Sequence, residues 1–112
     1  MKQELFQYSA TDLLKMYKNR ETKPYEVSVD IIKQIKKVNS KLNALIDFDE
    51  DMILDQAKKS SKRWEKGELT GLLDGIPLSI KDLLITKDYP TRRGSFVESI
   101  PVLSNKDAPV VK

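Results

Sequence analysis

The stretch Gly71-Leu-Leu-Asp-Gly-Ile-Pro-Leu-Ser-Ile-Lys-Asp82 decides the fold of this chain. Alternation along its apolar centre predicts a strand with Ile76, Leu78 and Ile80 on one face. Lys81 then lies where the strand gives way to a loop. Because an ammonium group is costly to desolvate, a lysine at such a place either reaches water or takes part in chemistry.

The composition limits the classes of protein that fit. The 112 residues suffice for about one small domain with a single core. Charged residues make up 33% and apolar residues 39%, so much of the chain must be solvated helix surface. The net charge of +3 comes from 20 basic and 17 acidic residues spread over the whole length. This even distribution indicates neither a nucleic-acid partner nor a membrane surface.

The chain contains no cysteine and no histidine. This excludes disulfides, thiol catalysis, a histidine base and the common zinc ligand sets. Acid–base chemistry near neutral pH therefore requires a lysine, aspartate, glutamate or tyrosine with a shifted pKa. No apolar run approaches the roughly 20 residues that span a bilayer, and the N-terminus lacks a signal-peptide core. We therefore expect a cytoplasmic protein without cofactor or metal.

Residues 1–67 predict a helical lead-in. Ser9 caps a short first helix, with Asp12 as capping-box partner, and this helix ends near Arg20. Pro24 fits the first turn of a second helix. The apolar stripe of that helix recurs at spacings of four, four, three and four residues: Val27, Ile31, Ile35, Val38 and Leu42.

An acidic segment, Asp47-Phe-Asp-Glu-Asp51, follows a brief apolar stretch at 43–48 that is a candidate strand. A calcium loop counted from its first aspartate would place Met52 where glycine is needed and Lys58 where a glutamate is needed. Carboxylates at a helix N-terminus are the better explanation, so a third helix follows and ends at Gly67. The apolar side of this helix carries Ile53, Ala57 and Trp64.

Residues 68–112 predict a strand and loop segment that carries the lysine, and we assign the whole chain to one domain. The last residues, 104–112, have the pattern of a helix that is being entered. Pro109 suits its first turn, and Asn105 and Asp107 are candidate caps. Because a single helical turn has nothing to propagate it, we expect the polypeptide to be the front part of a longer protein.

Four separated blocks stand in a characteristic order: Gly75-Ile-Pro-Leu-Ser-Ile-Lys-Asp82, Pro90-Thr91, Gly94-Ser95 and Asp107-Ala-Pro-Val-Val111. In order and spacing they resemble the N-terminal part of the amidase signature family of serine hydrolases. The lead-in helices share this likeness, which covers nearly the whole chain. The resemblance implies an α/β fold, here an N-terminal fragment with about three helices followed by a β segment.

The resemblance also implies a Ser, cis-Ser, Lys triad that cleaves a carboxylic amide. The lysine that ends the family's Gly-Ile-Pro strand is the catalytic base, and it maps onto Lys81. It takes a proton, through a bridging serine, from the serine that attacks the amide carbonyl. Both serines are expected downstream of this chain, so the fragment by itself is expected to be inactive. Ser79, Ser95 and Ser99 lie in no Gly-x-Ser-x-Gly turn and are not candidate nucleophiles.

A lysine that acts as a base near neutral pH needs a pKa of roughly 7–8 instead of about 10.4, and burial supplies such a shift. In an isolated chain of this size we expect Lys81 to be exposed and inert. We expect the apolar run from Ile76 to Leu84 to be incompletely buried, which favours self-association. Asp82 is expected to hydrogen-bond nearby backbone, and Gly75 to let the chain turn into the strand.

Three functions remain open. Leu83-Leu84 stands where A subunits of tRNA-dependent amidotransferases typically have asparagine, and Thr91-Arg-Arg-Gly-Ser95 replaces their Thr-Thr stretch. Both differences favour a free-standing hydrolase of a small-molecule amide, with Arg92 and Arg93 either solvated or in contact with an acidic group. The alternative is the A subunit of a glutamyl-tRNA(Gln) amidotransferase, which has partner subunits and a tRNA-bound substrate. A non-catalytic helical interaction module is the alternative from another class.

Overall fold

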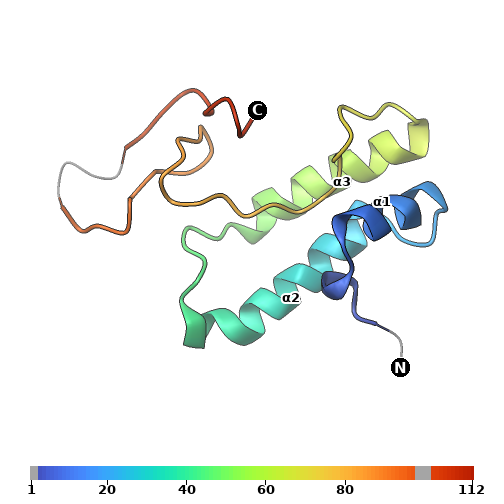
Figure 1. Cartoon of the computed structure of the whole chain (residues 1–112), viewed down its shortest axis with the longest axis horizontal. Helices are drawn as coiled ribbons and strands as arrows, with labels where there is room; N and C mark the ends of the chain where they lie inside the picture. The colour runs from blue at the N-terminus through green and yellow to red at the C-terminus, as the bar shows by residue number, and fades with distance from the viewer. Residues whose placement is uncertain (1–2, 98–101) are drawn as a thin grey trace. The chain divides into compact units, whose positions relative to one another are not determined.

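The structure is a computed structural model that describes residues 3–97 and 102–112. Within these ranges the regular secondary structure is helical (Figure 1). The elements are the 3-10 helix η1 Leu5–Gln7 and the α-helices α1 Ala10–Lys18, α2 Pro24–Leu42 and α3 Glu50–Lys66. None of these helices is long and apolar enough to cross a membrane. The chain forms two compact units, Met1–Pro77 and Leu78–Lys112. The assignment of all residues to one domain stays a prediction.

The first two α-helices begin where the sequence predicts. The Oγ atom of Ser9 accepts the backbone N–H of Asp12 at 3.1 Å, which caps α1. This helix ends at Lys18, close to the predicted end at Arg20. Pro24 is the first residue of α2 and is fully buried. Its missing N–H costs nothing there, because the first N–H groups of a helix have no partner within the helix.

The acidic segment caps α3, as predicted. The Oδ1 atom of Asp49 accepts the N–H of Met52 at 3.0 Å, and Gly67 ends the helix with a φ of +72°. The candidate strand at 43–48 is a loop instead. Its backbone is satisfied locally, because the side-chain amide of Asn39 accepts two N–H groups of the loop and donates to one of its carbonyls.

The core of the first unit lies where the helices meet. Helix α2 packs against α3, and the two run side by side in opposite directions (Figure 1). Leu13 and Tyr17 of α1 and Val27 of α2 are buried together. Trp64 of α3 meets the Tyr17 ring edge to face, with ring centroids 5.4 Å apart. The predicted stripe of α2 is therefore buried at its start, whereas Leu42 at its end is 67% exposed.

The turn that follows α3 is held by the buried carboxylate of Asp74, which the sequence pattern did not predict. Arg63 donates to it from Nε at 2.6 Å and from Nη2 at 2.7 Å, and Ser60 donates from Oγ at 2.5 Å. The N–H and hydroxyl of Thr70 each donate at 3.1 Å. The backbone carbonyl of Asp74 accepts the indole N–H of Trp64 at 2.9 Å. The guanidinium and these hydroxyl and amide donors hold the pKa of the Asp74 carboxyl well below its usual range.

Gly75 allows the turn that was predicted for it. Its φ is +87°, and a Cβ atom there would lie 2.5 Å from Cγ of Pro24 and 2.9 Å from Oγ of Ser60. Its carbonyl accepts the hydroxyl of Tyr17 at 2.9 Å. Burial raises the pKa of the Tyr17 phenol, so this hydroxyl remains a donor. The turn is thereby joined to α1, α2 and α3.

The predicted strand from Ile76 to Ile80 is not formed, and the predicted α/β class is not seen in the described residues. A strand needs a neighbouring backbone for its N–H and C=O groups. The β pairing that the described ranges contain is one isolated antiparallel bridge between Thr91 and Val102. Ile76 packs on the helical core, whereas the other large apolar side chains of the run are exposed, as expected. The exposed members are Leu78, Ile80, Leu83 and Leu84.

We predict that Asp74→Asn lowers the free energy of unfolding by about 3 kcal/mol at neutral pH, because it leaves Arg63 and its polar neighbours poorly paired. The folded-state pKa of Asp74 is depressed, so its carboxylate stabilises the fold above the unfolded-state pKa of about 3.9 and loses this effect as the pH falls below it. The difference between wild type and variant should therefore shrink in acid. Urea unfolding followed by Trp64 fluorescence measures this.

The matched control is Asp51→Asn, which changes an exposed aspartate in the first turn of α3. Its effect should stay below about 1 kcal/mol, as for a charge near a helix end. An Asp74→Asn effect that is no larger than that of the control, or that is constant down to strongly acidic pH, would contradict the proposed role of the carboxylate.

We predict that Gly75→Ala lowers the free energy of unfolding by about 1–3 kcal/mol, because the new methyl group meets Pro24 and adopts an unfavourable φ. Gly71→Ala is the matched control, since nothing lies within 4 Å of its added Cβ and its φ is not in the left-handed region. It should change stability by no more than about 0.5 kcal/mol. Thermal unfolding of both variants measures these changes in stability. Equal losses of stability in the two variants would contradict the prediction.

Candidate active site

Lys81, the predicted catalytic base, lies in the second unit with its side chain exposed. Its backbone carbonyl accepts the N–H groups of Leu83 at 2.7 Å and of Leu84 at 3.0 Å, which closes a tight turn directly after the lysine. The backbone on the C-terminal side of Lys81 is therefore held by hydrogen bonds, while its side chain is exposed to solvent. This agrees with the expected exposure of the lysine.

Asp82 joins the lysine to the Thr91-to-Ser95 block. Its Oδ1 atom accepts the N–H of Arg92 at 2.6 Å, and its Oδ2 atom accepts the N–H of Gly94 at 3.0 Å. The loop can aim both groups at one carboxylate because Arg93 and Gly94 have φ values of +53° and +64°. The N–H groups of Arg92 and Gly94 lower the pKa of the Asp82 carboxyl. The predicted bonding of Asp82 to backbone is confirmed.

Two buried threonines stabilise this loop: Thr91, which belongs to the predicted block Pro90-Thr91, and Thr86, which the sequence pattern did not single out. The hydroxyl of Thr91 donates to the carbonyl of Leu84 at 3.2 Å, and its backbone exchanges two hydrogen bonds with Val102. The hydroxyl of Thr86 donates to the carbonyl of Tyr89 at 3.0 Å and accepts its N–H at 3.1 Å. The sequence signal for this turn was Thr86, a hydroxyl residue that lies between the apolar Ile85 and the nearby Pro90.

The last block also reaches this loop. The Oδ1 atom of Asp107 accepts the N–H of Lys87 at 2.9 Å, and its Oδ2 atom lies 3.7 Å from the ammonium of the same lysine. The N–H of Ala108 donates to the carbonyl of Ile85 at 2.8 Å. Asp107 therefore binds the backbone and side chain of Lys87, and it is not the helix cap that the sequence predicts. After Asp107 the chain forms a single turn instead of the predicted helix. This turn is closed by a hydrogen bond from the N–H of Val111 to the carbonyl of Ala108.

The serines of the segment do not form a nucleophile site with Lys81 in the described residues. Ser79 is exposed, and the Oγ atom of Ser95 accepts the N–H of Val97 at 3.2 Å within a local turn. Ser99 lies outside the described residues. No cluster of three or more metal-ligating side chains occurs in the described ranges. The candidate site therefore consists of Lys81 on a loop segment whose backbone is held by Asp82, Thr91 and Asp107.

Comparison with known proteins identifies the class. The Amidase family matches residues 26–112. The A subunit of the glutamyl-tRNA(Gln) amidotransferase of Staphylococcus haemolyticus is 39% identical over 83 residues, which cover 74% of this chain and 17% of that protein. The acylamidase of Rhodococcus erythropolis is 33% identical over 92 residues, which cover 82% of this chain and 19% of that protein. No solved structure gives a significant match.

The chain belongs to the amidase family, as the resemblance of its blocks indicates. The match includes Lys81 and every segment that packs around its loop. The chain spans less than a fifth of the length of the two curated relatives named above.

We predict that Asp82→Ala releases the loop at residues 92–94, because its carboxylate is the acceptor for two of the loop's N–H groups. Amide hydrogen exchange of Arg92 and Gly94, followed by NMR, should become faster. Asp88→Ala, at an exposed aspartate of the same loop region, is the control and should leave both rates unchanged. Unaltered protection of these amides in the Asp82 variant would show that the carboxylate does not hold the loop.

Proposed function

We propose that this chain supplies the catalytic lysine of a serine hydrolase that cleaves a small carboxylic amide through a Ser, cis-Ser, Lys triad, with Lys81 as the base. The observation that carries the proposal is the family match over residues 26–112, in which Lys81 ends the Gly75-Ile-Pro segment. The likeness to an acylamidase supports amide hydrolysis as the reaction. We further propose that the enzyme acts in the cytoplasm.

In this proposal the Nζ atom of Lys81 accepts a proton from a bridging serine, which in turn takes the proton of the nucleophilic serine. The nucleophile forms a bond to the amide carbonyl carbon. The C–N bond then breaks as the proton held by the lysine passes to the leaving amine, and water hydrolyses the remaining acyl-enzyme. Neither serine is assigned to a residue of this sequence. The turn after Lys81 and the bonds of Asp82 support the role, because they hold the backbone next to the lysine while its side chain is exposed.

The base role also needs an environment that the described residues do not provide. A lysine must be uncharged to accept a proton, and burial in apolar surroundings favours the uncharged form. Since Lys81 is exposed here, we propose that a further protein surface covers it in the active enzyme. The exposed apolar side chains on either side of the lysine, Leu78, Ile80 and Leu83, support such a covering.

A second candidate is the A subunit of a glutamyl-tRNA(Gln) amidotransferase. It is supported by the 39% identity to a protein of that name in Staphylococcus haemolyticus. In this case the same lysine chemistry would act within a complex of several subunits. The residues that follow Lys81-Asp82 favour the free-standing hydrolase, because Leu83-Leu84 replaces the asparagine that is typical of the amidotransferase.

The test uses the polypeptide that carries this sequence, purified from its native source after its intact mass has been measured. We predict that it releases ammonia or amine from simple amides without partner subunits. Lys81→Ala should reduce the rate by at least about a hundredfold, as expected for loss of a general base. Lys106→Ala, at another exposed lysine of the same unit, should retain the wild-type rate.

Amide hydrolysis that survives Lys81→Ala would refute the role of the lysine. A wild-type protein that is inactive by itself but becomes active with co-purified subunits would favour the amidotransferase. Absence of activity under both conditions would leave the non-catalytic interaction module as the function.

A further inference from the structure

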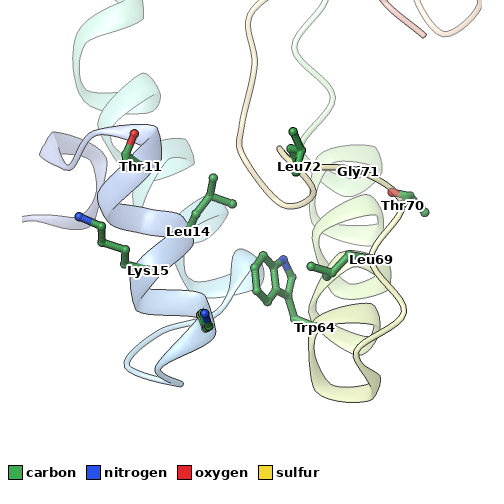
Figure 2. A pocket seen from close by; sticks show the side chains of 9 residues that line it. Thr11, Leu14, Lys15, Trp64, Leu69, Thr70, Gly71 and Leu72 are labelled. Atoms are coloured by element: carbon green, nitrogen blue, oxygen red, sulfur yellow. The ribbon is translucent and has the colours of Figure 1, made fainter.

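A shallow, open groove of about 580 Å³ lies on the first unit, which does not contain Lys81. Figure 2 shows helix α1 on one side of it and the turn that follows α3 on the other, with the ring of Trp64 between them. Leu14 faces this space from α1, and Leu69 and Leu72 border it from the turn. Its lining is therefore mainly apolar.

The wall formed by α1 is a single helical face. Thr11, Leu14, Lys15 and Lys18 recur at the spacing of one side of an α-helix, and all four line the groove. The two lysines are exposed, and neither forms an ion pair with any described residue. No acidic side chain is among the described residues that line the groove. The rim of the groove therefore carries two lysines and no lining carboxylate, which gives it a local positive charge.

The opposite wall is a turn held by hydrogen bonds. Leu72 is 93% exposed and Leu69 is 42% exposed. These leucines do not fold back onto the core, because both bonds from Thr70 to the Asp74 carboxylate fix the turn between them. An apolar surface that the fold holds in solvent, next to a groove with an aromatic floor, is typical of an interaction site.

We propose that this groove binds an acidic amphipathic helix of a partner protein. The apolar face of such a helix would cover Trp64, Leu14 and Leu72, as in other helix-in-groove interactions. Acidic residues three or four positions apart on its flank would meet Lys15 and Lys18, which have the matching spacing on α1. Figure 2 shows Lys15 extending away from Trp64, so the partner's anionic groups belong beside its apolar contacts and not at the groove floor.

Trp64 makes the proposal directly measurable, because it is the single tryptophan of the chain and lies in the groove. The probe is a synthetic helix of about 18 residues, with leucines along one face and glutamates on its flanks; the control peptide has lysines in place of the glutamates. We expect the acidic peptide to shift Trp64 emission to shorter wavelength. We expect the basic peptide to bind at least about tenfold more weakly.

Two double variants test the charge of the rim. Lys15→Glu with Lys18→Glu should reverse the preference, so that the basic peptide binds more tightly. Lys33→Glu with Lys37→Glu makes the same change in net charge on exposed positions of α2 and should leave the preference intact. Circular dichroism of each variant establishes that the helices are retained.

Equal binding of both peptides, or no change in Trp64 emission with either, would overturn the proposal. An emission shift that depends on the concentration of the protein itself would assign the groove to a second copy of the chain instead. A shift produced by anionic phospholipid vesicles and not by the acidic peptide would assign it to a membrane surface. Each of these results contradicts binding of a partner helix.

Discussion

The ionised carboxylate of Asp74 is the constraint on which the first unit depends. A buried charge is stable only when its partners compensate for lost hydration, and here Arg63, Ser60 and Thr70 all donate to it. These donors come from the last turns of α3 and from the turn behind it, so one side chain fixes where the chain leaves the helices. The neighbouring Gly75 then fits closely against α2, where no side chain has room.

Two carboxylates have a comparable role in the second unit. Asp82 accepts backbone N–H groups from the loop at 92–94, and Asp107 does the same for Lys87. The segment that carries Lys81 is thus bounded in sequence by Asp74 before it and Asp82 after it. Between them the chain has no ladder of backbone hydrogen bonds in the described residues, and side-chain acceptors replace that ladder as the source of local order.

The two proposed functions make different demands on exposed surface. Lys81 is solvated in this structure, whereas the proposed chemistry needs it covered. The residues that line the groove beside Trp64 all belong to the first unit. The first function therefore depends on protein surface outside the described residues, and the second on residues that are already in place.

The sequence by itself determined the helices, because their caps and apolar stripes act over a few residues. Ser9, Pro24 and Gly67 mark helix ends as predicted, and the acidic segment 47–51 supplies the cap of α3. It also placed Lys81 in its family block. The tertiary structure decided what depends on distant partners. A strand at Ile76 to Ile80 required a neighbour that the described residues lack, and the Asp74 network required donors up to 14 residues away. Serines at the buried positions 60 and 61 of α3, on the same face as Ala57, were the signal that a polar partner had to lie opposite.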